Sequence, residues 1–277
     1  GETVATLKVG KHPAGVAASR DGSRVVVTSP DSRELAVIDG RQQTVVARIP
    51  LGEGPLGVAI NAEGTRAYVA DFYGHYIALV DLEAGRELKR IPVGHYPAGV
   101  TVSADSTRLY VANREDNTVS AINGWTHAVE STGKVGGHPF GLLLDAQGRR
   151  LYVANVESND VSVLSTDTMT ELGRVAVGER PYALARVNNL LFVTNQYDST
   201  VSVIDTRELS PVATIEVGEY PEGVSSHPDG QHVYVANWFS NTVSVIDVPT
   251  LKVVQTIPVG NGSRGFGEFI PQGVFPH

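Results

Sequence analysis

The sequence of 277 residues contains no cysteine, one methionine and two tryptophans. Without cysteine, the chain has no disulfide bond and no thiolate to act as a nucleophile or a metal ligand. Its apolar runs are all shorter than the roughly 18 residues of a membrane-spanning helix, so we expect no membrane span. The formal net charge of −8 argues against binding to duplex DNA, which depends on Lys and Arg contacts to phosphates.

No segment shows a sustained 3.6-residue apolar period, so helices are expected to be nearly absent. The chain instead repeats one short motif six times, with the pattern Val/Leu-Gly-x-x-Pro-x-Gly/Ala. Successive prolines of this motif are 42, 42, 42, 42 and 40 residues apart. They are Pro13, Pro55, Pro97, Pro139, Pro181 and Pro221. A period of this length indicates one supersecondary unit in each repeat.

Each repeat continues with four short runs rich in Val, Ile, Tyr and Thr, separated by turn residues such as Asp21-Gly22. These residue types favour strands, and Asp-Gly favours a hairpin because Gly tolerates a positive φ. Four strands in about 40 residues are typical of a β-propeller blade. We therefore predict an all-β fold: a β-propeller of four-stranded blades that forms a single domain over residues 1–277.

A glycine recurs two positions after the motif proline, or after Ser263 where the motif returns near the end of the chain. These glycines are Gly15, Gly57, Gly99, Gly141, Gly223 and Gly265. Glycine inside a strand often marks a place where another backbone approaches closely. We therefore assign the strand after each proline to the crowded inner position of its blade.

The second and third strands of the repeat carry a family resemblance. The matching segments are LYVAN at 109–113 and 151–155, LFVTN at 191–195, VYVAN at 233–237, and TVSVID at 200–205 and 242–247. They resemble the YVTN-type β-propeller repeat of bacterial and archaeal surface or periplasmic proteins. The resemblance implies export to the periplasm or cell surface, and it implies seven blades, but it indicates the fold far better than the function.

Six complete repeats extend from about residue 10 to residue 259. Residues 1–9 match a fourth, outer strand, and residues 260–270 match a first, inner strand. A propeller commonly closes by building one blade from both chain ends, so that no sheet edge stays open. We expect a seven-bladed architecture whose closing blade is incomplete in this sequence, with its two middle strands supplied from before residue 1 or by a partner. In the alternative, six blades close on themselves and both ends pack as edge strands.

The linker before each motif proline and the loop between the second and third strands are expected to open onto one face of the propeller. The repeats differ most in these segments, as expected of a binding face on a rigid scaffold. We predict ligand-binding residues there, and they are His12, Asp71, Tyr73, His95, Tyr96, Arg114, His138, Arg180, Tyr197, Tyr220, Trp238 and Arg264. A turn or packing role is the alternative for several of them, above all for Asp71 and for the Asn that recurs in its place.

Recognisable catalytic and cofactor signatures are missing from the sequence. His12, His95 and His138 suit a transition metal chemically, but no paired-ligand spacing supports a site, so we predict neither a metal nor a cofactor. Gly260, Gly262 and Gly265 spell a dinucleotide-binding pattern, yet no βαβ unit surrounds them and two are glycines of the repeat. The chain has no nucleophile elbow and no phosphate-binding loop of the P-loop type.

Three functions fit these observations. The first is a noncatalytic, exported binding scaffold whose partner is a protein or a small molecule at the rim of the central channel. The second is a lactonase-like propeller hydrolase, with rim carboxylates and His12 or His138 as acid and base. The third is an accessory role beside haem or quinone redox proteins. The sequence favours the first.

Overall fold

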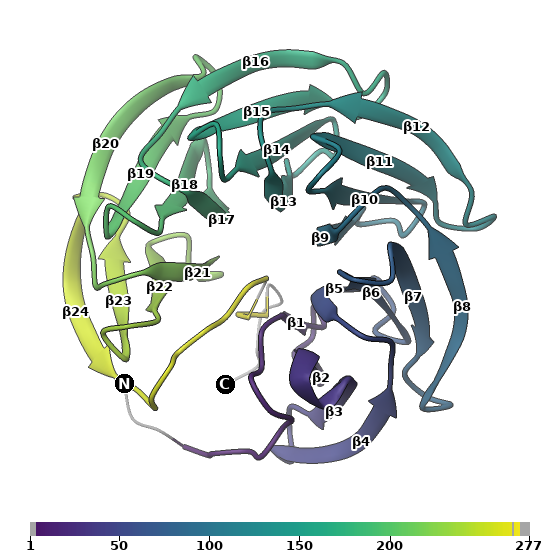
Figure 1. The fold of residues 1–277 in the computed structure, drawn as a ribbon. Helices are drawn as coiled ribbons and strands as arrows, with labels where there is room; N and C mark the ends of the chain where they lie inside the picture. Colours follow the sequence, from purple (N-terminus) through teal and green to yellow (C-terminus); the bar gives the residue numbers. More distant parts are fainter. Residues whose placement is uncertain (1–3, 268, 272–277) are drawn as a thin grey trace.

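The computed structural model describes residues 4–267 and 269–271, and this part of the chain is almost entirely β-structure. Its 24 strands form six four-stranded antiparallel sheets around a central axis (Figure 1), which confirms the predicted propeller of four-stranded blades. The one helix assigned within these residues is a 3-10 turn, Pro30–Ser32. None of the described helical segments is long and apolar enough to cross a bilayer.

Each blade uses four consecutive strands in order from the axis outwards. The inner strands are β1 (Val16–Ala18), β5 (Pro55–Ile60), β9 (Pro97–Val102), β13 (Pro139–Leu144), β17 (Pro181–Val187) and β21 (Pro221–Ser226). The second strands are β2 (Arg24–Ser29), β6 (Arg66–Asp71), β10 (Arg108–Asn113), β14 (Arg150–Asn155), β18 (Leu190–Asn195) and β22 (His232–Asn237). The third strands are β3 (Glu34–Asp39), β7 (Tyr76–Asp81), β11 (Thr118–Asn123), β15 (Asp160–Ser165), β19 (Thr200–Asp205) and β23 (Thr242–Asp247). The outer strands are β4 (Thr44–Pro50), β8 (Arg86–Pro92), β12 (Val129–Lys134), β16 (Glu171–Ala176), β20 (Ser210–Glu216) and β24 (Lys252–Pro258).

The hydrophobic core lies between neighbouring blades. Side chains alternate across a strand, so the middle strands of a blade present an apolar row to the blade on each side. Between blades two and three, Tyr68, Ile77 and Ile91 pack against Leu109 and Ile122. Equivalent clusters fill the other junctions between complete blades. The repeat thus builds one continuous ring of core from a single pattern.

The glycines of the inner strands lie where the blades crowd around the axis. A Cβ on Gly99 would be 2.1 Å from the carbonyl oxygen of Phe140 in the next blade, and a Cβ on Gly57 would be 2.1 Å from that of Ala98. These distances are too short for any side chain, which confirms the predicted close approach of inner strands. Around the ring, only the fifth repeat has Ala183 in place of this glycine.

The recurring Asn at the end of the second strand is a structural residue of the blade. The Nδ2 group of Asn113 donates to the hydroxyls of Thr118, 3.0 Å away, and Ser120, 2.9 Å away, on the third strand. Its Oδ1 accepts a hydrogen bond from the amide of Gly94, 3.1 Å away, in the linker before the inner strand. Asn195 and Asn237 make the same pairs of side-chain contacts to their third strands. The buried amide therefore fixes the rim end of the blades that carry this Asn.

The ring has seven positions, of which the seventh is filled only in part (Figure 1). A Cβ on Gly223 of β21 would lie 2.0 Å from the carbonyl oxygen of Gly265, as at the complete junctions. The C-terminal stretch then pairs in parallel with blade one: the amide of Val16 donates to the oxygen of Phe266, 2.8 Å away. Residues 263–267 therefore take the predicted inner position of a seventh blade, while residue 268 lies outside the described residues.

The outer strand predicted at residues 1–9 is not formed by residues 4–9, and residues 1–3 lie outside the described part of the chain. The side chain of Arg48 on β4 donates hydrogen bonds to the carbonyl oxygens of Lys8, 2.6 Å away, and Val9, 2.7 Å away. This N-terminal segment crosses the outer side of the open seventh position toward blade one (Figure 1), and no described strand pairs with it. A ladder needs a neighbouring strand about 4.8 Å away, and no described strand takes that place.

Candidate functional site

One face of the propeller collects the linkers before the inner strands and the loops between second and third strands. We call this face the rim: residues 10–12, 51–54, 93–96, 135–138, 177–180 and 217–220, with residues 30–33, 72–75, 114–117, 156–159, 196–199 and 238–241. Backbone hydrogen bonds join each linker to its loop, as from the Trp238 amide to the Tyr220 oxygen, 3.0 Å away. The predicted meeting of linker and loop on one face is therefore present.

The residue before the motif proline has a left-handed backbone in five linkers, with φ of 50° to 57° at His12, Tyr96, His138, Arg180 and Tyr220. This conformation costs about 1–2 kcal/mol for a residue with a side chain. The preceding blade holds it: the His138 amide donates to the side-chain oxygen of Asn117, 2.8 Å away, and the Arg180 amide to that of Asn159, 2.9 Å away. The most variable rim side chains therefore start from fixed backbone positions.

Blades five and six present an aromatic patch, which we define as Tyr197, Tyr220, Trp238 and Phe239 with Arg180. Tyr220 is at its centre, with ring centroids 5.7 Å from Tyr197, 5.5 Å from Trp238 and 4.7 Å from Phe239. The Arg180 guanidinium lies 4.7 Å from the centroid of the Tyr197 ring. Tyr197 and Phe239 are 53% and 55% exposed, so over half of each side chain faces solvent.

A second aromatic group covers the rim of blades two and three. Tyr96 packs edge-on against Phe72, with ring centroids 5.0 Å apart, and against His75, 4.9 Å apart. Tyr73 is mostly exposed beside them, 6.5 Å from Tyr96. The Tyr96 amide donates to Nδ1 of His75, 3.0 Å away, so this group also links two blades. Tyr73 and Tyr96, both predicted for the site, therefore lie together but in a sector other than the aromatic patch.

The residue after each motif proline, and its equivalent Arg264, varies around the inner ring: Ala14, Leu56, Ala98, Phe140, Tyr182, Glu222 and Arg264. Phe140 and Tyr182 stack with centroids 4.0 Å apart, and Phe266 meets Phe140 edge-on at 4.8 Å. Leu56 and Ala98 belong to the same apolar cluster. Side chains from five positions of the ring therefore meet in one apolar cluster near the axis, which we call the plug. Its members are Leu56, Ala98, Phe140, Tyr182 and, from the closing strand, Phe266.

A buried ion pair stands beside this plug. The guanidinium of Arg264 donates to both carboxylate oxygens of Glu222, at 2.6 and 3.1 Å, and Gln196 donates to the same carboxylate at 3.1 Å. Arg264 also lies over the Trp238 ring, 4.1 Å from its centroid. Burial raises the pKa of Glu222 although Arg264 and Gln196 oppose the rise. Burial also raises the pKa of Tyr182.

Glu222, Tyr182 and Gln196 were not predicted from the sequence. The signal was present in the motif, because the position between the proline and the glycine holds small or apolar residues in the first five repeats and a charge in the sixth. In the seventh copy of the motif, the equivalent position holds Arg264. A carboxylate and an arginine at equivalent positions of adjacent inner strands indicate an ion pair between these strands. Arg264 was predicted as a ligand-binding residue, and the structure places it half-buried in that pair.

The three predicted histidines do not converge. The ring nitrogen Nδ1 of His12 pairs with Asp31 of its own blade, and that of His95 lies 2.8 Å from Asp116. His138 pairs with Glu157 at 2.8 Å, and its Nε2 lies 3.8 Å from Glu115 of the preceding blade. Within the described residues, no group of three or more His, Asp and Glu side chains is arranged to hold a metal ion.

Two further predicted residues have partners within the rim. Arg114 pairs with Glu115, with Nη1 2.5 Å from Oε1. Asp71 occupies the place of the recurring Asn and is 1% exposed. Its carboxylate accepts hydrogen bonds from the Gly54 and Gly74 amides and from the Tyr76 hydroxyl, which is 2.9 Å away. We therefore leave Asp71 out of the candidate site and assign it the structural role of the Asn.

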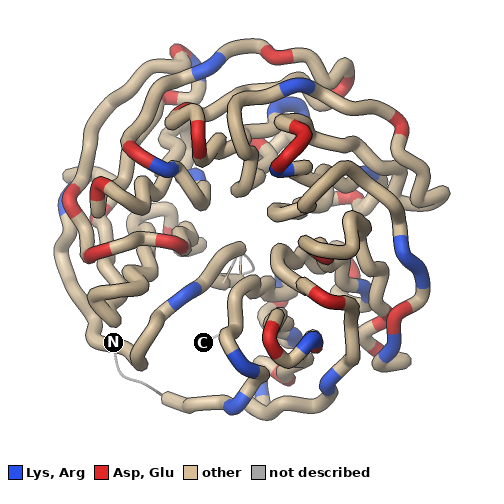
Figure 2. Tube along the Cα trace, viewed as in Figure 1, with Lys and Arg blue, Asp and Glu red and all other residues tan. Residues whose placement is uncertain are grey.

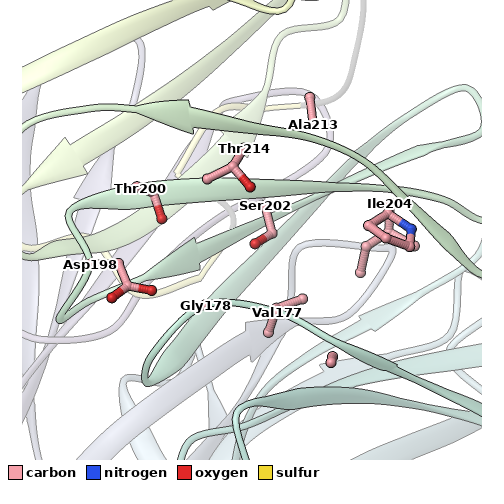
Figure 3. A pocket seen from close by; sticks show the side chains of 10 residues that line it. Val177, Gly178, Asp198, Thr200, Ser202, Ile204, Ala213 and Thr214 are labelled. Atoms are coloured by element: carbon pink, nitrogen blue, oxygen red, sulfur yellow. The ribbon is translucent and has the colours of Figure 1, made fainter.

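The described residues form two hollows. One, of about 360 Å³, opens between the outer strands of blades four and five (Figure 3). Its polar groups serve the blade, since Thr200 and Ser202 accept hydrogen bonds from Asn195, and Asp198 accepts one from the Glu179 amide. The other, of about 460 Å³, lies on the opposite face between blades one and two, around Asp21 and Glu63. Figure 2 shows acidic and basic residues interspersed around the ring.

Comparison with known proteins bears on the fold and, over part of the chain, on the family. Residues 47–174, which cover blades two to four, match the family model described as lactonase, 7-bladed β-propeller. A structure described as hydrazine synthase from Kuenenia stuttgartiensis superimposes with a TM-score of 0.84, at 17% identity, over 96% of this chain and 92% of that chain. A protein of unknown function from Desulfotomaculum acetoxidans DSM 771 gives 0.81, at 19% identity, over 94% and 89%. The search of curated proteins found no match. At these identities the structural likeness shows the fold alone.

Proposed function

We propose that the protein is a binding scaffold whose aromatic patch on blades five and six contacts a protein partner. The observation that carries this proposal is the exposure of Tyr197 and Phe239 around Tyr220 and Trp238, beside the Arg180 guanidinium. Tyr, Trp and Arg are enriched among the residues that dominate binding energy at protein interfaces. An exposed apolar patch with a polar surround is also typical of an interaction site.

The fixed backbone of the rim favours binding. Arg180 and Tyr220 are held by left-handed linkers, and the rings support one another edge-on or tilted. Little conformational entropy is then lost when a partner docks, which favours affinity. The rings fill the space between them rather than enclosing a hollow, and such a surface suits a partner protein better than a small molecule, which needs a concave site. Export to the periplasm or cell surface stays a prediction of the repeat resemblance.

The experiment compares two tryptophans, because the chain has only Trp125 and Trp238. Trp125 is 76% exposed in the turn after β11, at the end of the blade opposite the rim. Affinity capture from the source cells is done with the unaltered protein, with Trp238→Ala and with Trp125→Ala. We expect a partner that both the unaltered protein and Trp125→Ala retain and that Trp238→Ala binds about 30-fold more weakly, the effect of losing a residue worth about 2 kcal/mol.

The captured partner is then purified and titrated against Trp125→Phe, in which Trp238 is the one remaining tryptophan. Binding at the patch changes the fluorescence of that tryptophan. A partner that binds Trp238→Ala and the unaltered protein equally would exclude the patch as the contact surface.

Lactone hydrolysis is the second candidate, and the family match over residues 47–174 favours it. His138 has the geometry of a general base: Glu157 holds Nδ1 at 2.8 Å, which leaves Nε2 to take a proton from water. The water oxygen would add to the lactone carbonyl, the ring C–O bond would break, and the product would be a hydroxy acid. Lactone turnover that His138→Gln abolishes and His12→Gln leaves unchanged would support this activity, and absence of turnover in the unaltered protein would reject it.

A further inference from the structure

Residues 262–264 hold both ends of the loop that carries Trp238 of the aromatic patch. The amide of the first of these residues, a glycine, donates to Oδ1 of Asn241, 2.6 Å away, at the end of that loop. The hydroxyl of Ser263 donates to the carbonyl oxygen of Asn237, 2.8 Å away, directly before Trp238. Proline, which has no hydroxyl, occupies this position in the six complete repeats, so the second hydrogen bond is specific to this loop.

The guanidinium of Arg264 lies over the Trp238 ring and is itself held in place. Its carbon Cζ is 4.1 Å from the ring centroid, a distance at which a cation is attracted to the face of an indole. Glu222, which is 2% exposed, accepts hydrogen bonds from Nε and Nη2 of this arginine at 2.6 and 3.1 Å. Such a bidentate pair fixes the orientation of the guanidinium as well as its position. The Trp238 ring therefore packs against a group that cannot easily turn away.

The carboxylate of Glu222 also reaches the other loop that carries the aromatic patch. Gln196, which is 5% exposed, donates from Nε2 to Oε1 of Glu222, 3.1 Å away. This glutamine directly precedes Tyr197 in the loop of blade five. One buried carboxylate thus connects the Tyr197 loop with the arginine that lies over Trp238.

The second aromatic group, on blades two and three, has no such support from the inner strands. Leu56 and Ala98 take the places of Glu222 and Arg264 there, so no charge from these positions reaches the ring of Phe72. None of the five junctions between complete blades has an ion pair at these positions. The propeller therefore closes without such a pair, and a buried ion pair is in general weak evidence of added stability. The pair accompanies the aromatic patch rather than the repeat.

We propose that Glu222 and Arg264 are positioning residues of the aromatic patch, and that their pair holds the Trp238 ring and the Tyr197 loop in the arrangement that binds. A change that undocks residues 262–264 from blade six then also disorders the binding surface. This inference rests on the function proposed for the patch, since positioning matters only at a surface that binds. The placement of the Trp238 ring is nevertheless measurable without a partner.

The test follows the fluorescence of Trp238 in the Trp125→Phe background, where it is the one remaining tryptophan. Arg264→Met removes the cation and both hydrogen bonds but keeps an unbranched apolar side chain, and Glu222→Gln removes the charge of the partner. We expect each variant to raise the acrylamide quenching constant of Trp238 and to shift its emission to longer wavelength, because the ring becomes more accessible to water. The two changes combined should add little to Arg264→Met alone, since the two residues act as one unit.

Arg150→Met in the same background is the matched control. Arg150 also makes a hydrogen bond between blades, from Nη1 to the carbonyl oxygen of Thr206, 2.7 Å away, at the end of the blades opposite the rim. Its loss should leave the quenching and the emission of Trp238 unchanged, even where the melting temperature falls. Circular dichroism shows which variants are folded. If Arg264→Met does not fold, Glu222→Gln decides the question, because it keeps the size of the side chain and an amide that can form hydrogen bonds.

Binding is measured separately, with the partner that the unaltered protein captures. Arg264→Met should bind it about fivefold more weakly, because the Trp238 ring would then lose its freedom only on docking. Unchanged fluorescence in Glu222→Gln and Arg264→Met, equal changes in Arg150→Met, or full binding by Arg264→Met would each overturn the positioning role. If the fluorescence changes as expected but the unaltered protein captures no partner, the proposed function fails, whereas the hold of the pair on Trp238 is supported.

Discussion

The junction between blades two and three and the junction beyond blade six have the same residue pattern and different burial. Tyr68, Ile77 and Ile91 are 2%, 0% and 1% exposed against blade three, whereas Tyr234, Val243 and Ile257 are only partly covered. The repeat therefore sets which face of a blade is apolar, and the neighbour sets how much of that face is buried. The free energy that an apolar residue contributes depends on the area removed from water, so equivalent residues should differ in energetic importance.

The largest expected effect is on the pair Ile91 and Ile257, which occupy the same position of the outer strand. Ile91→Ala should lower the free energy of unfolding by about 2–5 kcal/mol, since it leaves a cavity in a closed core. Ile257→Ala should cost about 1 kcal/mol, because part of that side chain is already in water. Urea denaturation of both variants measures the difference. Equal losses would mean that the open junction is as tightly packed as the closed one.

A glycine pair tests the inner ring in the same way. Gly99→Ala should cost about 1–3 kcal/mol by overpacking, because its Cβ would meet the Phe140 carbonyl oxygen at 2.1 Å and the inner strands would have to separate. Gly260 precedes the closing strand, and a Cβ added to it would have no atom within 4 Å. We expect Gly260→Ala to leave the melting temperature unchanged or slightly higher. A neutral Gly99→Ala would show that the ring can expand at this junction.

The ion pair at the closing strand should show a distinct pH dependence. Because burial raises the pKa of Glu222, the folded state binds a proton more tightly than the unfolded state does. This residue therefore adds stability as the pH falls from 7 through its raised pKa, and the gain is complete below its unfolded value near 4.5. Glu222→Gln removes this titrating group. As the pH falls, the free energy of unfolding of the unaltered protein should therefore rise relative to that of Glu222→Gln, by at most about 1.4 kcal/mol per pH unit.

Denaturation curves at several pH values give this difference, and Glu219→Gln, which removes an exposed rim carboxylate nearby, is the matched control. If the unaltered protein loses stability relative to Glu222→Gln as the pH falls, the attraction of Arg264 exceeds the effect of burial, and the pKa of Glu222 is lowered rather than raised.

The smallest effect is expected at His12, in the linker of blade one beside the open junction. Its pair with Asp31 is exposed, with 78% of the His12 side chain accessible. Exposed ion pairs contribute about 0–1 kcal/mol, so His12→Ala should change the free energy of unfolding by no more than that. Thermal denaturation at pH 6 checks this value. A larger loss would show that the linker, rather than the core face, limits the stability of blade one.

The sequence was sufficient for the blades because their pattern is local. The strand bounds follow from the turn residues, the alternation of apolar residues and the spacing of the prolines, which can all be found within one repeat or between two successive repeats. The rim was only partly predictable. Tyr197, Tyr220 and Trp238 meet as an aromatic patch, whereas His12, His95 and His138 remain apart, because linkers of different blades are brought together by the curvature of the ring rather than by sequence distance. Asp71 illustrates the same limit, since the repeat position alone could not show its hydrogen bond to Tyr76.

The sequence by itself determined the repeat, the all-β fold, the order of strands in a blade and the closely packed glycines of the inner strands. Each of these features follows from the local sequence pattern, and that pattern recurs six times. Only the tertiary structure decided the number of positions in the ring, the irregular path of residues 4–9, the plug formed with Phe266 and the pairing of Glu222 with Arg264. These depend on the angle between successive blades, and that angle is set by side-chain packing between repeats that are 40 to 42 residues apart in the chain.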